Sequence, residues 1–459
     1  MSLSPWTPEY RKLSAGIIAL VSVFGFEGIS VATVMPVVAR ELHSLGNYSV
    51  AFTSYSMAAL LGMTFAGLYA NRIGLYRVVM FTMGSMAVGS IIAGAAHSMS
   101  FFVIGRIIQG FGIGIDLVAM YVIIGRTYRE EIRPRAIGML AGAWVVPGLI
   151  GPGLAGLIVT YTSWRTIFLA IPFVLVLPLA LLVPPLRHVG AVQEVSAPQA
   201  RAKVSATVLA VLGLAGIQWA CSHAGDWSIL QVVVMSLCGL VAVAVSTRWL
   251  MPVGYLRLTH GIATIVGLRG LTAAAYFSTE VYVPLALQNR GVSVAWSGGI
   301  LATACVTWFA GSSFQARNPL GWTRKKLLVF GISAMTISIV LLPAVAFLPS
   351  HVMTCVVLSC VVWGASAFGM GIIFASLGVL VLDYSPDHAH AANSASLQMS
   401  DSFGVVSVTA LTGAFLAAAE RSGGPSNGTF TLMWALCAGV GLVALFAAPR
   451  IESRLSPAI

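Results

Sequence analysis

The chain has 459 residues, of which 58% are apolar and only 8% are charged, whereas soluble domains carry about 25% charged residues. Its formal net charge is +11. These values argue against a soluble enzyme, a disordered regulator or a secreted disulfide-bonded domain. Apolar runs of about 20 residues recur along the chain, each long enough to cross a bilayer core of about 30 Å as a helix, and they predict an all-α polytopic membrane protein.

Hydropathy predicts 14 transmembrane helices in three groups. The first six cover residues 14–38, 50–70, 78–97, 100–125, 136–160 and 165–185. Two more cover 204–222 and 227–248, and the last six cover 260–287, 295–315, 327–348, 352–382, 391–418 and 429–449. The predicted domains are an N-terminal six-helix bundle (1–186), a cytoplasmic linker (187–203), an extra two-helix hairpin (204–248) and a C-terminal six-helix bundle (249–459). The first apolar run has no small-residue cleavage site, so it is interpreted as a retained first span.

The distribution of Lys and Arg predicts the orientation, because short cytoplasmic loops retain positive charge. With both termini cytoplasmic, most of the 25 basic residues fall in cytoplasmic segments. The exceptions are two within spans and four outside, Arg40, Arg165, Arg290 and Arg421. We therefore expect a multi-pass protein of the cytoplasmic (inner or plasma) membrane. The same loops account for the net charge without a nucleic-acid partner.

The cysteines and the known catalytic patterns point away from metal binding and enzymatic chemistry. All six cysteines lie in or beside apolar runs, without a CxxC pair or a histidine at ligand spacing. We therefore expect no disulfide, no metal site and no bound cofactor. A membrane-embedded enzyme or scaffold is the rival class, but no HExxH, GxSxG or paired histidine array occurs.

Two motifs in the first group of spans carry a family resemblance. The connection between the second and third spans reads Gly67-Leu-Tyr-Ala-Asn71-Arg72-Ile-Gly74-Leu-Tyr-Arg77. It is similar to the loop pattern GxLaDRxGrk of the major facilitator superfamily, although Asn71 replaces that family's Asp. The fourth span contains Arg106-Ile-Ile-Gln109-Gly110-Phe-Gly112, similar to the pattern RxxQGxG that the family associates with proton coupling. A weaker echo of the loop pattern after span ten is expected of duplicated halves.

A third motif lies in the fifth span and reads Pro147-Gly148-Leu-Ile-Gly151-Pro152-Gly153-Leu-Ala155-Gly156. It is similar to the antiporter pattern GxxxGPxxGG, with departures at Pro147 and Ala155. With 14 spans, the chain resembles the superfamily's drug/proton antiporter family, and the resemblance covers nearly the whole chain. It implies the major facilitator fold, two six-helix bundles plus an inserted two-helix hairpin.

Glycine and proline within these motifs predict a conformational role. Pro147 and Pro152 remove backbone hydrogen bonds and favour a bend, while small residues let helices approach closely. The alternative for any single glycine is ordinary tight packing. The predicted conformational residues are Gly67, Asn71, Arg72, Gly74, Arg77, Gly148, Gly151, Pro152 and Gly156.

Six ionisable residues fall inside predicted spans, namely Glu27, Arg106, Asp116, Arg269, Glu280 and Asp401. Each opposes insertion by about 2.5 to 3.5 kcal/mol at a helix centre. Two bases cannot neutralise four acids, and a carboxyl group without a partner in apolar surroundings favours its neutral form. Reversible protonation is therefore the expected use of these acids.

The expected proton-coupling residues are Glu27, Arg106, Asp116 and Asp401, with Glu27 as the coupling carboxylate and Arg106 as its functional partner. Each has a structural alternative. Glu27 can be a permanently protonated or solvated acid, Arg106 can hold backbone carbonyls, and both aspartates can act as hydrogen-bonding residues. Arg269 and Glu280 lie about 16 Å apart along one helix and are not expected to pair.

The resemblance implies a central cavity, and its candidate lining residues are Phe24, Tyr55, Trp144, Tyr276, Glu280 and Trp308. Aromatic surfaces accept apolar and cationic compounds. Lipid contact or core packing is the alternative for each ring, and solvation near the outer rim is the alternative for Glu280.

These observations predict proton-coupled efflux, an antiport of lipophilic or cationic small molecules such as drugs, by alternating access and with the proton gradient as the energy source. The alternative of the same fold is a lipid or glycolipid translocator, or an exporter of one dedicated metabolite. The expected partners are the substrate, protons and membrane lipids, and the resemblance implies a monomer.

Overall fold

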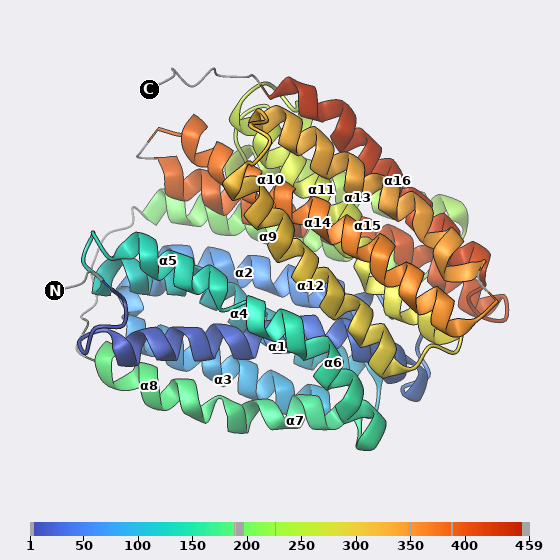
Figure 1. The fold of residues 1–459 in the computed structure, drawn as a ribbon, viewed down its shortest axis with the longest axis horizontal. Helices are drawn as coiled ribbons and strands as arrows, with labels where there is room; N and C mark the ends of the chain where they lie inside the picture. The colour runs from blue at the N-terminus through green and yellow to red at the C-terminus, as the bar shows by residue number, and fades with distance from the viewer. Residues whose placement is uncertain are drawn as a thin grey trace. The chain divides into compact units, whose positions relative to one another are not determined.

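The computed structural model describes residues 4–187, 189, 197–224, 226–348, 350–386 and 389–451. Side chains are excepted at 70–72, 134, 141, 197–200 and 391. The described residues form helices joined by turns (Figure 1). Two compact units result. Unit 1 contains the chain up to Ser44 and Val50–Val211, and unit 2 contains Leu45–Ser49 and the chain from Leu212 onward.

Unit 1 contains the helices α1 to α8 and the first part of α9. Their bounds are α1 Arg11–Glu41, α2 Val50–Ile73, α3 Leu75–Gly94, α4 Met99–Thr127, α5 Arg133–Gly142, α6 Val145–Tyr161, α7 Trp164–Val174, α8 Val176–Leu186 and α9 Ala197–Ser222. Side-chain N-caps begin two of them, because Ser98 accepts from Phe101 N and Ser163 accepts from Arg165 N. Such caps satisfy backbone N–H groups that have no partner inside the helix.

The predicted fifth span is broken in the structure rather than continuous. Residues Ala143 and Trp144 form a turn between α5 and α6. Pro147 has no N–H to donate to the Ala143 carbonyl four residues earlier. The Ser22 hydroxyl of α1 donates to that carbonyl instead, at 3.1 Å. The expected bend is therefore present, and it falls just before Pro147. The predicted sixth span is similarly divided at Leu175 into α7 and α8.

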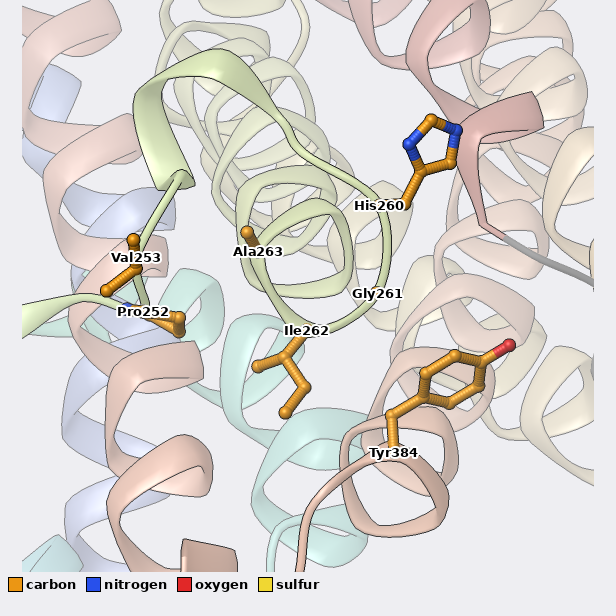
Figure 2. A pocket seen from close by; sticks show the side chains of 7 residues that line it. All are labelled: Pro252, Val253, His260, Gly261, Ile262, Ala263 and Tyr384. Atoms are coloured by element: carbon orange, nitrogen blue, oxygen red, sulfur yellow. The ribbon is translucent and has the colours of Figure 1, made fainter.

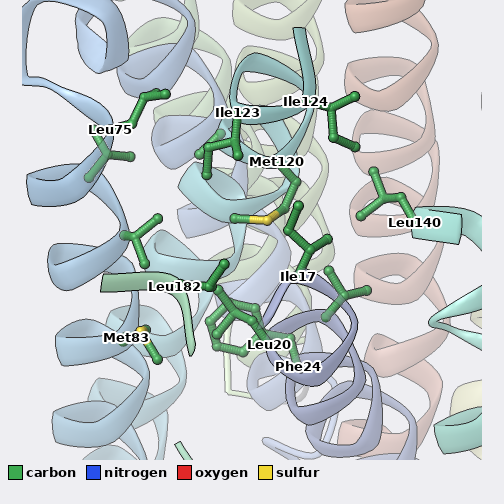
Figure 3. Close-up of a cluster of buried hydrophobic side chains, with 14 of the residues drawn as sticks. Ile17, Leu20, Phe24, Leu75, Met83, Met120, Ile123, Ile124, Leu140 and Leu182 are labelled. Carbon is green, nitrogen blue, oxygen red and sulfur yellow. The ribbon is translucent and has the colours of Figure 1, made fainter. Parts of the chain in front are cut away.

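The apolar core of unit 1 joins α1, α3, α4, α5 and α8. Figure 3 shows side chains of these helices gathered together, and they include Ile17, Phe24, Met120 and Leu182, none more than 1% exposed. Burial of each such side chain contributes about 1.5 to 3 kcal/mol relative to exposure in water. Phe24 belongs to this core, which matches the core-packing alternative for that ring.

Unit 2 contains the rest of α9 and the helices α10 to α16. Their bounds are α10 Ile229–Leu250, α11 Ile262–Asn289, α12 Val294–Arg317, α13 Arg324–Phe347, α14 Val352–Tyr384, α15 His390–Arg421 and α16 Asn427–Ala447, with short 3-10 turns η1 Tyr255–Arg257 and η3 Ala448–Arg450. This order reproduces the predicted pair of extra helices followed by six more.

The two units repeat one packing pattern. In unit 1, α2 and α3 both pack on α4, α1 packs on α6 and α8, and α3 packs on α7. In unit 2, α12 and α13 both pack on α14, α11 packs on α15 and α16, and α13 packs on α16. With α5–α6 and α7–α8 each counted as one span, the same ordinal helices pair in both halves. This is the architecture expected of a duplicated six-helix bundle.

Glycine permits the closest helix contacts at equivalent places in both units. A side chain on Gly110 of α4 would collide with the backbone of Tyr55 in α2. A side chain on Gly371 of α14 would collide with the backbone of Trp308 in α12. Small residues at such crossings are a recurring device of membrane helix packing.

With α5–α6 and α7–α8 each counted as one, thirteen helical spans among the described residues are long and apolar enough to cross a membrane. The helix α11 is not one of them, although it has 28 residues. It carries Arg269, Glu280 and many hydroxyl groups, and nearly all of its residues are buried. Its polar groups find partners inside the unit, as where Ser278 lies 2.8 Å from Thr409 on α15. Taken with the 13, α11 completes the 14 helices that hydropathy predicts.

Residues Leu45–Ser49, between α1 and α2, pack within unit 2. The Glu420 carboxylate at the end of α15 accepts hydrogen bonds from the backbone N–H groups of Leu45 and Gly46. Tyr48 is 0% exposed, and its hydroxyl donates to the Val281 carbonyl of α11 at 2.9 Å. These five residues complete unit 2 although they come from the first part of the sequence.

Candidate functional site

The first candidate site is a buried ion pair within unit 1. Arg106 of α4 donates from Nη1 to the carboxylate of Glu27 on α1. The side chains are 2% and 0% exposed. Breaking such a pair by removing one partner typically costs about 3 to 5 kcal/mol, because it leaves an uncompensated charge in the interior. The two residues that sequence reasoning grouped are therefore in direct contact.

Arg106 is also held by Gln109 of its own helix and by two residues of α2. Its Nη1 donates to Gln109 Oε1 at 2.9 Å, and its Nε donates to the Ala51 carbonyl of α2 at 3.4 Å. The guanidinium carbon lies 4.1 Å from the centroid of the Tyr55 ring, a cation–π contact. Gln109 in turn donates to Ser90 of α3 at 2.8 Å. One polar network therefore links α1, α2, α3 and α4.

Two acidic oxygens beside this network have no hydrogen-bond partner among the described residues. They are Glu27 Oε2 and Asp116 Oδ1. Asp116 lies further along α4, is 2% exposed, and interacts electrostatically with Tyr55. A buried oxygen without a partner costs about 1 to 3 kcal/mol, so each such group needs an explanation. Proton binding is one use that fits both.

The antiporter-like motif lies against the helix that carries Glu27. Gly151 of α6 faces Ser30 and Phe26 of α1, and the Trp144 ring at the α5–α6 break lies beside Gly25. Gly148, Gly151, Pro152 and Gly156 are all buried in α6. The break and the small residues of α6 therefore meet α1 within three residues of Glu27.

The loop motif between the second and third spans is shorter than hydropathy predicts. Helix α2 continues to Ile73 and α3 begins at Leu75, so Gly74 alone joins them. Gly74 has φ +91°, a conformation that glycine adopts without a steric penalty. Gly67 and Arg77 are exposed. The side chains of Asn71 and Arg72 lie outside the described part of the chain.

Unit 2 contains a second ion pair that sequence reasoning did not predict. Arg269 Nε of α11 lies 2.8 Å from Asp401 Oδ1 and 3.0 Å from Oδ2, on α15. The guanidinium carbon lies 3.1 Å from the Phe374 ring centroid. Asp401 thus has a permanent cationic neighbour, which supports the structural alternative for it. No sequence signal connects positions 132 residues apart on separate helices.

A phenol lies next to this pair, outside the membrane-spanning segments. Tyr255 of η1 has its hydroxyl 2.9 Å from the Ser400 hydroxyl, and Ser400 donates to the Val266 carbonyl at 2.7 Å. Burial, and then the nearby charge of Asp401, raise the pKa of the Tyr255 phenol. The phenol therefore stays neutral and positions the connection before α11.

Rings from α11, α12 and α14 form a continuous row in unit 2. Tyr276 stacks on Trp363 at 4.7 Å and meets Trp308 edge-on at 5.5 Å, and Trp308 meets Phe374 at 4.9 Å. Glu280 lies one helical turn beyond Tyr276 and interacts electrostatically with it. In the described part of the chain, Glu280 has no ion pair or hydrogen bond.

The sequence-predicted cavity residues differ in exposure. Tyr276 is 2% exposed, whereas Tyr55, Trp144, Glu280 and Trp308 are partly exposed. A separate pocket of about 400 Å³ holds none of them (Figure 2). It lies in unit 2, where the connection before α11 meets the end of α14, and is lined by Pro252, Val253, His260, Gly261, Ile262, Ala263 and Tyr384. Within the described ranges, no three His, Cys, Asp or Glu residues gather to hold a metal ion.

The fold and the buried pair define a class, a polytopic membrane protein of duplicated six-helix units, the architecture of secondary transporters. The sequence profile of the Major Facilitator Superfamily matches residues 15–370. The chain belongs to the Major Facilitator Superfamily. That family, and the transporter names of its relatives, indicate a transporter rather than an enzyme.

Relatives of known name include multidrug transporters. The multidrug efflux pump SdrM of Staphylococcus aureus (strain N315) is 22% identical over 337 residues, 71% of this chain and 74% of that protein. Multidrug resistance protein 3 of Bacillus subtilis (strain 168) is 28% identical over 153 residues, 33% of this chain. The chain spans only 30% of the length of that second relative.

Solved structures of low identity share the fold. The POT family transporter PepTSo matches with a TM-score of 0.68 and 13% identity, over 95% of this chain and 98% of that one. At this identity the likeness shows the fold alone.

Proposed function

We propose that this protein exports lipophilic or cationic small molecules in exchange for protons, by alternating access in a cytoplasmic membrane. One observation carries the proposal. A buried carboxylate on α1 is paired with an arginine on α4, in a network that links four helices. The naming of relatives as multidrug pumps supports the substrate class.

The geometry supports a proton-dependent link between α1 and α4. Protonation of Glu27 removes one charge of the pair. Arg106 then keeps Gln109 and the Ala51 carbonyl as acceptors, and Tyr55 as a cation–π partner. The contact between α1 and α4 is thereby weakened without leaving the arginine alone. Reversible protonation of this kind can bias a two-state equilibrium of helix positions.

The break between α5 and α6 supports a conformational response. The Ala143 carbonyl is held by Ser22 of α1 instead of by its own helix, because Pro147 cannot donate to it. Glu27 lies on the same helix, five residues further along. A shift of α1 on protonation would therefore act directly on the break.

The proposal is tested by proton movement in proteoliposomes that contain the full chain. An acid-inside gradient is imposed, lipophilic cationic dyes and antibiotics are added, and collapse of the gradient is followed. Wild type is expected to release protons in response to substrate, and Glu27→Gln is expected to lose this response. The matched control is Glu41→Gln on the same helix, where the carboxylate pairs with Arg165 at the helix end. It should retain the response.

Three outcomes would count against the proposal. Full substrate-dependent proton release by folded Glu27→Gln would show that this carboxylate does not carry the proton. Substrate movement by wild type without any proton response would exclude proton antiport as the mechanism. Failure with every drug-like compound, in folded protein, would favour a lipid translocator or a dedicated metabolite exporter.

A further inference from the structure

We propose that unit 2 holds a binding site for aromatic organic cations, made by the Glu280 carboxylate and the partly exposed rings of Phe277, Trp308 and Phe374. The inference rests on the proposed function in one respect, that such cations are transported. Its geometry lies wholly inside unit 2 and does not involve Glu27 or Arg106.

The three rings form a single apolar surface. Their centroids are 6.0 Å apart for Phe277 and Trp308, 4.9 Å for Trp308 and Phe374, and 6.1 Å for Phe277 and Phe374. Each ring touches the other two although they come from three different helices. All three are partly exposed, so ring surface is available to a ligand. Such faces attract cations as well as aromatic groups.

Buried rings fix this surface from behind. Tyr276, 2% exposed, stacks on Trp363, which is 0% exposed, and meets Trp308 edge-on at 5.5 Å. Helices α12 and α14 are closely packed here, because a Cβ atom on Gly371 would collide with the backbone carbonyl of Trp308. The aromatic surface is therefore held in place before a ligand arrives, which lowers the entropy cost of binding.

The acid lies at one end of the same surface. Glu280 follows Phe277 by three residues on α11, so the two share a helix face about 4.5 Å apart along the axis. Across from it on α12, Cys305 precedes Trp308 by three residues and interacts electrostatically with Glu280. The carboxylate and the rings therefore run side by side along two adjacent helices. Within the described chain, no cationic side chain pairs with Glu280.

An arginine that is already ion-paired lies at the opposite end of the surface and distinguishes that end from the Glu280 end. Arg269 lies over the Phe374 ring, with its guanidinium carbon 3.1 Å from the centroid, and pairs with Asp401. That ring face is taken. A ligand cation finds neither a free ring face nor an unpaired carboxylate at that end, whereas Glu280 attracts it. We therefore assign the cationic group of the ligand to the Glu280 end and its apolar rings to Trp308 and Phe277.

The test is equilibrium binding of two probes to the purified full chain in lipid nanodiscs. Tetraphenylphosphonium carries phenyl rings and a charge that does not depend on pH, and triphenylphosphine oxide carries phenyl rings without net charge. Glu280→Gln is expected to weaken tetraphenylphosphonium binding about tenfold or more, because a charge-assisted contact is lost. It should change binding of the neutral probe by less than about twofold. Trp308→Ala is expected to weaken both.

The matched control is Glu130→Gln, a carboxylate whose side chain is 84% exposed in the α4–α5 connection of unit 1. It should bind both probes like wild type. The inference is overturned if Glu280→Gln binds tetraphenylphosphonium as wild type does, if it weakens both probes equally, or if wild type binds no cation.

The proposed function and this inference fail separately. No proton gradient is present in the binding assay, so Glu27→Gln should bind tetraphenylphosphonium normally even though it loses coupled transport. A wild-type protein that shows Glu280-dependent binding but no proton coupling would refute only the proposed function. Intact coupling with Glu280-independent binding would refute only the site.

Discussion

Removing Arg106 is expected to destabilise unit 1 far more than removing both charges of the buried pair. In Arg106→Gln, the Glu27 carboxylate is left 0% exposed without its cation, and the Ala51 carbonyl loses its donor. Breaking a buried pair in this way costs about 3 to 5 kcal/mol. For a unit of roughly 200 residues that corresponds to a fall in Tm of about 6 to 20 °C.

The double variant Glu27→Gln, Arg106→Gln should recover part of this loss, because two neutral amides of similar length can hydrogen-bond to each other. A coupling energy of about 1.5 kcal/mol or more is expected between the two sites. Acidification should also reduce the loss of Tm in Arg106→Gln, since protonation neutralises the Glu27 carboxylate that has lost its partner. Acidification should not reduce the loss of Tm in Glu27→Gln in this way, because that variant has no carboxylate at position 27.

The assay needs a probe in unit 1. All six cysteines lie in unit 2, so a thiol-reactive dye added to the native chain would follow unfolding of the wrong unit. A background without native cysteines, with one thiol introduced at Ala119 of α4, where exposure is 0%, reports on unit 1 directly. Additive effects of the two substitutions, or an unchanged Tm in Arg106→Gln, would refute the account of the pair.

Two further predictions concern packing and charge. Gly110→Leu should separate α2 from α4 and destabilise the protein by more than about 3 kcal/mol, whereas Gly153→Ala, where nothing lies within 4 Å, should be neutral or gain up to about 1 kcal/mol. Equal thermal stability of the two variants would contradict the close-contact reasoning. Asp401→Asn should lower stability by about 3 kcal/mol, because its ion pair is largely buried. Asp383→Asn should cost less than about 1 kcal/mol, because Asp383 pairs with Arg324 at the surface, with side chains 49% and 43% exposed. Denaturant unfolding that gave Asp401→Asn and Asp383→Asn the same loss of stability would refute this ranking.

Helix number, order and approximate bounds could be predicted from the sequence, because a membrane span needs a long apolar run whatever its neighbours are. The exact helix ends were harder to predict from the sequence. Hydropathy places a polar loop around residues 71–77, yet α2 and α3 continue to Ile73 and from Leu75. A single glycine with positive φ reverses the chain there, and hydropathy carries no information on backbone angles.

The ionisable residues likewise could be predicted in part, since the sequence shows which of them lie inside spans but not all of their partners. Their presence inside spans marked Glu27 and Arg106 as functional candidates, and the structure pairs them. The partner of Arg269 could not be deduced, because the closeness of α11 and α15 arises from packing of the whole unit. Phe24 illustrates the converse case. Its position on the first span was known, but whether it faced an opening or the core depended on Met120 and Leu182, which lie on other helices.

Unit 2 is not encoded by one continuous stretch of sequence, since Leu45–Ser49 belong to it. The partner of the Tyr48 hydroxyl, Val281, is 233 residues further along the chain. At about 5 to 20 residues per second, ribosomes need roughly 10 to 50 s to reach it. During that interval Tyr48, which is fully buried in the folded protein, lacks the part of α11 that contacts it. A C-terminal fragment that begins at residue 212 would have the reverse defect, with a vacancy beside Tyr282 and a Glu420 carboxylate deprived of two backbone donors. Splitting this transporter into two genes at its central linker would therefore leave neither product structurally complete.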